Sequence, residues 1–67
     1  MTNLIKEERL KKNMTQTELA ALANVSRQTI FSIETNKYIP SVMLALKIAR
    51  VLGKKVDYLF DLSDEDL

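Results

Sequence analysis

Residues 22–29 of the chain read Leu22-Ala23-Asn24-Val25-Ser26-Arg27-Gln28-Thr29. This stretch lies between two segments whose apolar residues have helical spacing, in a chain that contains one glycine. Asparagine enters the left-handed backbone region at lower cost than most residues, so Asn24 can end a helix sharply. Ser26 follows two residues later and can cap the next helix. The stretch therefore predicts a tight corner between two short helices.

Residues that cap or end helices predict further helices along the rest of the chain. Asparagine, serine and threonine stand at the expected helix ends, and Thr15-Gln16-Thr17-Glu18 has the pattern of a capping box. No segment alternates with period two for long enough to predict a strand. The predicted helices span about residues 3–12, 15–23, 26–35, 41–52 and 56–61, followed by an acidic end over 61–67. The expected fold is all-α, in one domain over residues 1–67.

Helical spacing also predicts which side chains face the core. We expect Asn3 to cap the first helix, and Ile5 and Leu10 to turn inward from it. Ile30 and Ile33 turn inward from the third helix. The inward residues expected for the second and fourth helices are Leu19, Ala20, Ala23, Val42, Leu44, Ala45, Ile48, Ala49 and Leu52.

Composition excludes several classes of function. The 67 residues include no cysteine and no histidine, which excludes disulfides, ordinary zinc sites and catalysis by a thiol or an imidazole. No apolar run approaches the roughly 20 residues of a membrane span, and the N-terminus lacks the apolar stretch of a signal peptide. Glu18 is needed by its capping box and the acidic end is too exposed to tune a pKa. We therefore expect a cytoplasmic protein that is no enzyme, with no metal, cofactor, small-molecule substrate or membrane partner.

Charge is distributed unevenly along the chain. Ten basic and four acidic residues precede position 57, a net charge of +6, whereas five acidic and no basic residues follow from Asp57 on. A basic body with an acidic end favours a polyanionic partner. A solvated surface with an acidic tail is the alternative explanation.

The outward residues of the third helix carry the chemistry of base recognition. Arg27, Gln28 and Ser32 face outward near its start, with Thr29 beside them. Arginine can bond bidentately to guanine and glutamine to adenine. Helical hairpins with other functions share the corner, and Arg27 and Gln28 could be solvated first-turn residues, although the helix dipole does not favour arginine there.

Three runs at this spacing resemble the helix-turn-helix of the phage Cro and C1 repressor family, also called the XRE family. They are Thr-Gln-x-Glu-Leu-Ala from Thr15, Ser-Arg-Gln-Thr-Ile from Ser26 and Ile-Glu-x-x-Lys from Ile33, and the resemblance extends from about Asn3 to Phe60. It implies a compact five-helix DNA-binding domain in which the second and third helices form the helix-turn-helix.

The resemblance also implies roles for individual residues. Gln16 would contact phosphate. The side chains of Arg27, Gln28 and Ser32 would face bases or nearby DNA backbone. Lys37, together with the protein backbone around Asn36, would bind phosphate. The candidate DNA-binding residues are Gln16, Ser26, Arg27, Gln28, Thr29, Ser32, Asn36, Lys37 and Tyr38. In the same family, residues at the positions of Arg9 and Glu34 form a partly buried ion pair. Two independent surface charges are the alternative.

Some residues depart from the family pattern. The family commonly has glycine where this chain has Asn13, Asn24 and Asn36, so we expect a left-handed backbone at each. Phe31 lies where many relatives carry a small or polar residue. Burial against the fourth or fifth helix is favoured for Phe31 over contact with a thymine methyl group. Tyr38 either stacks in its loop or donates its hydroxyl to phosphate.

The leading hypothesis is a sequence-specific regulator of transcription, a repressor from a bacterial or phage context that binds double-stranded DNA. Family members commonly act as two-fold dimers on palindromes. The expected homodimer contact is the fifth helix with the end of the fourth, because the apolar side chains there exceed what so small a core can bury: Val56, Tyr58, Leu59, Phe60 and Leu62. The alternative is a protein-interaction module, such as an antirepressor, adaptor or antitoxin, that keeps the fold without strong DNA binding.

Overall fold

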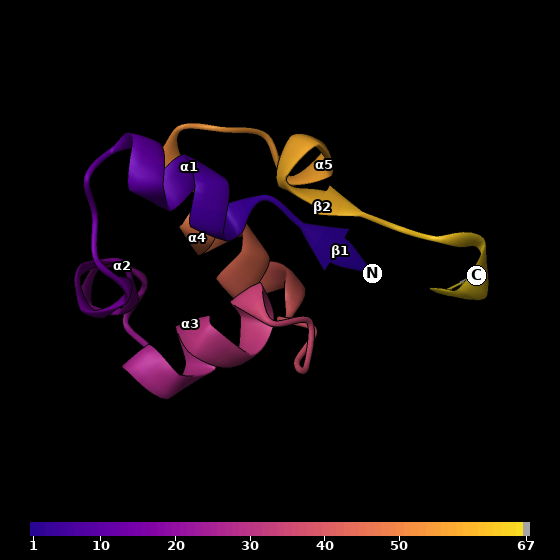
Figure 1. The fold of residues 1–67 in the computed structure, drawn as a ribbon, viewed down its shortest axis with the longest axis horizontal. Helices are drawn as coiled ribbons and strands as arrows, with labels where there is room; N and C mark the ends of the chain where they lie inside the picture. Colours follow the sequence, from indigo (N-terminus) through magenta and orange to yellow (C-terminus); the bar gives the residue numbers. More distant parts are fainter. Residues whose placement is uncertain (67) are drawn as a thin grey trace.

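A computed structural model describes residues 1–66 of the chain. Its five helices confirm the expected all-α architecture, with two short strands added at the ends (Figure 1). The helices are α1 (Ile5–Lys11), α2 (Gln16–Ala23), α3 (Arg27–Glu34), α4 (Val42–Leu52) and α5 (Val56–Leu59). The strands are β1 (Thr2–Asn3) and β2 (Phe60–Asp61), and a 3-10 turn, η1 (Asp64–Asp66), follows them. Leu67, the last residue of the expected acidic end, lies outside the described residues.

The two ends of the chain meet in a small antiparallel sheet. Thr2 is opposite Asp61 and Asn3 is opposite Phe60, and the Leu4 N–H donates to the Leu59 carbonyl at 2.8 Å. Beyond β2 the chain leaves the body of the molecule as a projecting segment, the C-terminal arm (residues 62–66; Figure 1). The α2–α3 pair lies on the far side of the body from this arm.

One hydrophobic core joins all five helices. Its largest fully buried side chains are Ile5, Leu19, Ile30, Ile33, Ile48, Leu52 and Leu59. Met14 and Val25, which precede the capping residues of α2 and α3, pack against this core. These two contacts fix the angle at which the chain enters each helix. The inward residues expected for α2 and α3 are therefore confirmed.

The corners between helices have the backbone that the asparagines predict. Asn13, Asn24 and Asn36 have φ values of 54°, 60° and 61°, and they are the non-glycine residues with positive φ in the described chain. At the α2–α3 corner the Asn24 N–H donates to Ala21 and the Val25 N–H donates to the Ala20 carbonyl at 2.9 Å. Asn24 thus ends α2 and redirects the chain within two residues.

Side-chain caps begin the helices on either side of these corners. The capping box between Thr15 and Glu18 is complete, since each side chain accepts a hydrogen bond from the other residue's backbone N–H. Ser26 Oγ accepts from the Thr29 N–H at 3.1 Å, and Ser41 caps α4 in the same way. Such caps contribute about 1 kcal/mol each to the free energy of unfolding, so the capping residues predicted from the sequence stabilise the fold.

Substitution of Asn24 tests the energetics of the α2–α3 corner. Asn24→Gly should leave the free energy of unfolding nearly unchanged, because glycine adopts positive φ without strain. Asn24→Val should lower it by about 1–2 kcal/mol, because a β-branched residue is strained in the left-handed region. Urea denaturation of both variants provides the comparison. A valine variant as stable as the parent would show that the corner does not depend on a left-handed residue.

The start of the chain differs from the expectation. Asn3 lies in β1, one residue before the N-cap position of α1, which Leu4 holds without a side-chain hydrogen bond. Its Oδ1 still accepts from the N–H of Ile5, the first residue of α1, at 3.1 Å, so Asn3 satisfies one donor at the start of the helix as expected. The Asn3 amide also donates to the Ile33 carbonyl at 2.8 Å and so ties β1 to the end of α3. Leu10 is 54% exposed, contrary to prediction, because the short α1 turns Glu8 and Arg9 inward.

The end of the chain also differs. Helix α5 stops at Leu59, two residues earlier than expected, because Phe60 and Asp61 extend into β2 and pair with β1. In α4, Val42 is 77% exposed and does not join the inward row that its spacing predicts. None of the helices in residues 1–66 is long and apolar enough to cross a membrane.

Candidate DNA-binding site

The first turn of α3 presents polar side chains to solvent. Arg27 and Gln28 are exposed, and Thr29 and Ser32 are half-buried on the same helix. Five of the nine candidate residues line one shallow depression of about 260 Å³: Gln28, Thr29, Ser32, Lys37 and Tyr38. The sequence placed these residues on two separate segments, and the fold brings them together.

Local hydrogen bonds fix the orientation of this first turn. Besides capping α3, the Ser26 hydroxyl lies 2.9 Å from the Thr29 hydroxyl. Both side chains are therefore held by each other and by the helix start. This arrangement leaves Arg27 and Gln28 as the residues of the first turn whose polar groups extend outward.

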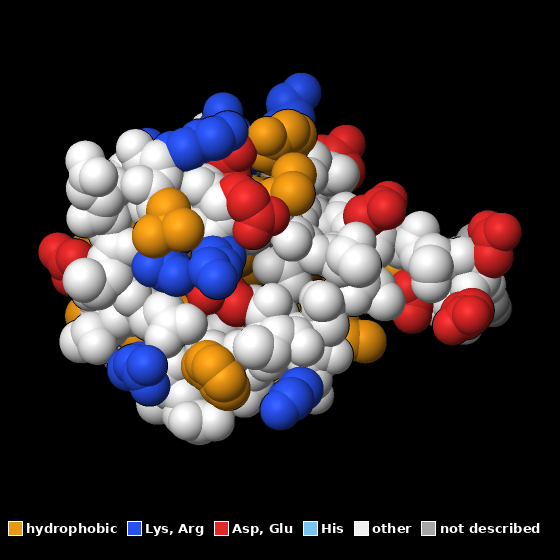
Figure 2. Space-filling model, in the orientation of Figure 1, with side chains coloured by type: hydrophobic (Ala, Val, Ile, Leu, Met, Phe, Trp, Pro, Cys, Tyr) orange, Lys and Arg blue, Asp and Glu red, His pale blue; other side chains and the backbone are white. Residues whose placement is uncertain are grey.

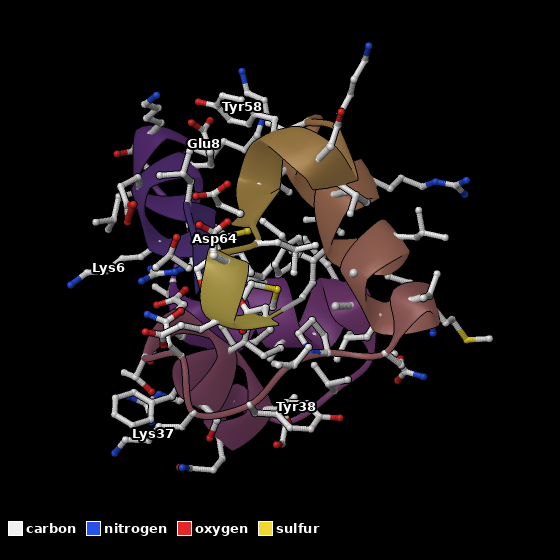
Figure 3. The ribbon with its side chains drawn as sticks, turned by 90° about the vertical axis from the view of Figure 1, so that its right-hand side faces the viewer. Lys6, Glu8, Lys37, Tyr38, Tyr58 and Asp64 are labelled. Atoms are coloured by element: carbon white, nitrogen blue, oxygen red, sulfur yellow. The ribbon has the colours of Figure 1, made fainter. Side chains whose placement is uncertain are left out.

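The segment after α3 carries the other wall of the depression. The Lys37 N–H donates to the Ser32 carbonyl at 2.8 Å across the left-handed Asn36, which places Lys37 directly beside the helix end. Asn36 Oδ1 accepts from the Asn3 amide at 3.2 Å. Figure 3 shows Lys37 and Tyr38 together at the end of the molecule opposite Tyr58. A cation and a phenol are thus held next to the polar face of α3.

The Arg9–Glu34 ion pair that the family resemblance implies is present and buried. Arg9 Nε lies 2.8 Å from Glu34 Oε2, Arg9 Nη2 donates to Glu34 Oε1 at 3.1 Å, and the two side chains are 8% and 3% exposed. Arg9 Nη1 also donates to the Met14 carbonyl at 2.8 Å. One guanidinium therefore connects α1, the α1–α2 turn and α3.

Gln16 belongs to the same network. Its amide donates to Glu34 Oε1 at 3.0 Å, a bond that links the start of α2 to the end of α3 and that the sequence did not predict. The bond uses one of the two amide hydrogens of Gln16, and the carbonyl and the second hydrogen are left for other partners. Glu34 thereby holds Gln16 in a fixed position at the exposed start of α2.

A second buried acid was missed by the sequence analysis. Glu8 is 3% exposed, accepts hydrogen bonds from the Tyr58 hydroxyl at 2.9 Å and from Lys11 Nζ at 3.0 Å, and lies 3.9 Å from Lys54 Nζ. Figure 3 shows Glu8 and Tyr58 side by side. The position of Glu8 three residues after the buried Ile5 is a signal that could have indicated its inward direction.

The hydrogen bonds around Glu8 shift the ionisation of its neighbours as well as its own. Those from Lys11 and Tyr58 lower the pKa of Glu8 below its ordinary value of 4.5. The same contacts raise the pKa of Lys11 and of Tyr58. A carboxyl whose pKa is lower in the folded state stabilises the fold above pH 4.5, and this contribution is lost as the pH falls through the folded-state pKa. At neutral pH the contacts of Glu8 with Lys11 and Tyr58 therefore hold α5 against α1.

Phe31 lies outside the core, which corrects the favoured prediction. Its side chain is 37% exposed, whereas the neighbouring Ile30 and Ile33 are fully buried. Over α3, Figure 2 shows hydrophobic atoms at the surface between two basic side chains. The outer face of α3 is therefore polar and basic with one aromatic ring.

One residue of the expected dimer surface is corrected. Leu59 is fully buried and belongs to the core, so it is not available for contact with another molecule. Tyr58 is 48% exposed, and its hydroxyl donates to Glu8. Val56 and Phe60 line an apolar groove of about 430 Å³, whose other walls are formed by Met1, Ile39, Pro40, Val42, Ala45, Leu46, Asp57 and Leu62.

Exposed apolar side chains line this groove and continue beside it, a surface that the sequence did not predict. We call the set the apolar face: Ile39, Val42, Met43, Leu46 and Leu62, which are 55% to 77% exposed. Contiguous exposed apolar surface on a small protein marks an interaction site more often than a random feature of the surface.

The uneven charge of the sequence becomes a spatial separation in the fold. On the face drawn in Figure 2, acidic side chains cover the C-terminal arm, and basic side chains lie over the body and near α3. The arm folds back at its tip, where Asp66 lies 2.9 Å from the Met1 ammonium. This contact and bonds from Ser63 lower the pKa of Asp66 to about 2. The contact with Met1 therefore holds Asp66 at the tip of the arm, away from α3.

Two helices joined at a left-handed corner, the second with an exposed polar first turn, define a helix-turn-helix protein. The comparisons agree. A family model described as "Helix-turn-helix" matches residues 5–59. An uncharacterized HTH-type transcriptional regulator of Archaeoglobus fulgidus is 49% identical over 67 residues, which cover 100% of this chain and 94% of the relative.

Relatives from other organisms give the same result. An uncharacterized HTH-type transcriptional regulator of Methanocaldococcus jannaschii is 46% identical, over 98% of this chain and 100% of its own length. The uncharacterized HTH-type transcriptional regulator YgzD of Bacillus subtilis is 38% identical over the same shares. The chain belongs to the XRE-type helix-turn-helix family of DNA-binding transcriptional regulators, which are not normally enzymes.

Proposed function

We propose that this protein is a sequence-specific repressor that binds a palindromic operator as a homodimer, with α3 in the major groove. The observation that carries the proposal is the outer face of α3, where exposed Arg27 and Gln28 adjoin the depression that also contains Ser32, Lys37 and Tyr38. The proposal includes a cytoplasmic location, because the proposed operator would lie in genomic DNA.

The chemistry of these side chains suggests a division of roles. Arg27 and Gln28 have the donors and acceptors for bidentate contact with guanine and adenine, respectively. Lys37 lies at the end of α3, where it would contact the phosphate backbone and contribute affinity that does not depend on sequence. Gln16, held by Glu34, would contact phosphate at the start of α2. Ser26, Thr29, Asn36 and Tyr38 would position or supplement these contacts.

A homodimer would supply the specificity that one helix lacks. A single recognition helix covers only a few base pairs, and two-fold dimers place two such helices one DNA turn, about 34 Å, apart. The apolar face and its groove flank the α3–α4 connection, so contact through them would leave both copies of α3 free to face one duplex. We therefore propose Val56, Phe60 and the apolar face as the dimer contact, in place of Tyr58 and Leu59.

Selection from random duplex DNA, followed by sequencing, tests the proposed function. We expect recovery of a symmetric motif whose half-sites are one helical turn apart. Binding should weaken steeply with salt, because phosphate contacts release counterions. Recovery of no motif, together with weak salt dependence, would favour the alternative function as a protein-interaction module.

Alanine substitutions should separate sequence recognition from phosphate binding. Arg27→Ala and Gln28→Ala should each cost about 1–3 kcal/mol on the selected operator and less on unrelated DNA, because each removes a base contact. Lys37→Ala should weaken binding to both DNAs alike and reduce the salt slope by about one. Fluorescence anisotropy titrations at several salt concentrations measure both quantities.

Lys55→Ala is the matched control for Lys37→Ala. Lys55 is exposed and carries the same charge, but it lies at the start of α5, on the other side of the molecule from α3 (Figure 1). This variant should bind operator nearly as the parent does. Equal losses on operator and unrelated DNA for Arg27→Ala, Gln28→Ala and Lys37→Ala would contradict the assignment of α3 as the recognition helix.

A further inference from the structure

Phe31 is a partly exposed aromatic residue on the outer face of α3. It is 37% exposed, whereas Ile30 and Ile33 on the same helix are fully buried. Its backbone carbonyl accepts from the Thr35 hydroxyl at 2.8 Å, so the backbone around it is regular and its position on the helix is fixed. The exposed part of the ring is therefore available for contact with a partner.

The position of Phe31 on the helix places it beside the residues proposed to contact bases. It follows Arg27 by four residues and Gln28 by three, the two spacings that bring side chains together on one helical face. Each of these neighbours is exposed. If α3 enters the major groove with Arg27 and Gln28 toward the base edges, the Phe31 ring enters with them.

A phenyl ring has no hydrogen-bonding group, so its preferences in the groove are limited. It cannot bind a phosphate or the polar edge of a base, and contact with either would cost desolvation without a new bond. The major groove offers one apolar group, the C5 methyl of thymine. A ring that is partly exposed in the free protein gains from covering such a methyl.

We propose that Phe31 is a specificity-determining residue that recognises a thymine in each half-site through contact with its C5 methyl group. The inference rests on the proposed function, since it requires α3 in the major groove. It adds to that function a preference for one base that neither Arg27 nor Gln28 can supply.

Replacement of thymine by deoxyuridine tests this contact directly, because deoxyuridine pairs identically and lacks only the methyl group. Each thymine of the selected operator is replaced in turn, in both half-sites together. The parent protein should lose affinity at one symmetric pair of positions, by about fourfold per half-site, the effect expected for one buried methyl group. Both half-sites together should give roughly fifteenfold.

Two variants show which side chain senses the methyl group. Phe31→Ala should bind the thymine operator more weakly than the parent and should bind the thymine and deoxyuridine operators equally at that position. Arg27→Ala should bind more weakly overall but keep the thymine preference. Circular dichroism melts of Phe31→Ala should show that the variant is folded at the temperature of the binding measurements, so that the change in affinity reports the ring and not loss of the fold.

The outcomes distinguish this inference from the proposed function. If Arg27→Ala and Gln28→Ala impair operator binding but no deoxyuridine substitution does, the thymine contact is wrong and the proposed function stands. The thymine contact is also wrong if Phe31→Ala keeps the preference for thymine over deoxyuridine. The same holds if Phe31→Ala loses equal affinity for the thymine operator and the deoxyuridine operator. If Arg27→Ala and Gln28→Ala have no effect on operator binding, the proposed function itself fails.

Discussion

Glu34→Ala is expected to lower the free energy of unfolding by about 3–5 kcal/mol, because it leaves the Arg9 guanidinium buried without its partner. Arg9 is tied to Glu34 through two hydrogen bonds of 2.8 and 3.1 Å, and its side chain is 8% exposed. The substitution also removes the acceptor that holds Gln16. Urea denaturation followed by circular dichroism measures the loss.

Two further variants give this prediction its controls. Glu7→Ala removes an exposed acid from the first turn of α1 and should change the free energy of unfolding by less than about 0.5 kcal/mol. The double variant Arg9→Met/Glu34→Leu should recover much of the stability lost in Glu34→Ala, because two apolar side chains can replace a buried ion pair. A loss below about 1 kcal/mol in Glu34→Ala would contradict the prediction.

Leu46→Glu is expected to lower the affinity for a palindromic operator by about 10²-fold or more, because it removes the gain that comes from linking two binding units. Leu46 lies in the proposed dimer contact and is 55% exposed, so a carboxylate there is solvated in the monomer and the fold is kept. In a two-fold interface each substitution occurs twice, which places two buried carboxylates in one contact. Affinity for a single half-site should remain unchanged.

Leu10→Glu is a closely matched control. Leu10 is 54% exposed and lies on α1, away from the apolar face, so the same substitution there should leave operator affinity near that of the parent. Sedimentation with a labelled operator supplies the stoichiometry. Two copies of the parent should bind one intact palindrome, and a one-to-one complex at saturating protein would exclude the homodimer. Parent-like affinity of Leu46→Glu on the palindrome would exclude this surface as the contact.

The α2–α3 side of the molecule could be predicted because its causes are local. The left-handed Asn24, the serine cap at Ser26 and the outward direction of Arg27 and Gln28 depend on residues within about one helical turn of each other. Backbone energies of single residues and the helical period are properties of the sequence itself. The corner and the exposed polar first turn of α3 therefore followed directly from the pattern, and the family resemblance identified them as parts of a helix-turn-helix.

The Arg9–Glu34 pair was predicted on another basis. The two residues are 25 positions apart in the chain, and nothing in their local patterns connects them. Resemblance to a family supplied the pairing, and the structure shows its geometry. The additional bond from Gln16 depends on where α2 meets α3, so neither the pattern nor the resemblance predicted it.

Short-range energies set the number and order of the helices, the corners between them and the exposed polar start of α3, so these features could be predicted from the sequence. The tertiary structure decided the pairing of β1 with β2, the burial of Glu8 against Tyr58 fifty residues away and the burial of Leu59 in place of Leu10. A chain this small has more apolar side chains than its core can bury. Which of them are buried depends on how all the helices pack together, and this packing leaves Phe31 on α3 and Leu46 on the apolar face exposed.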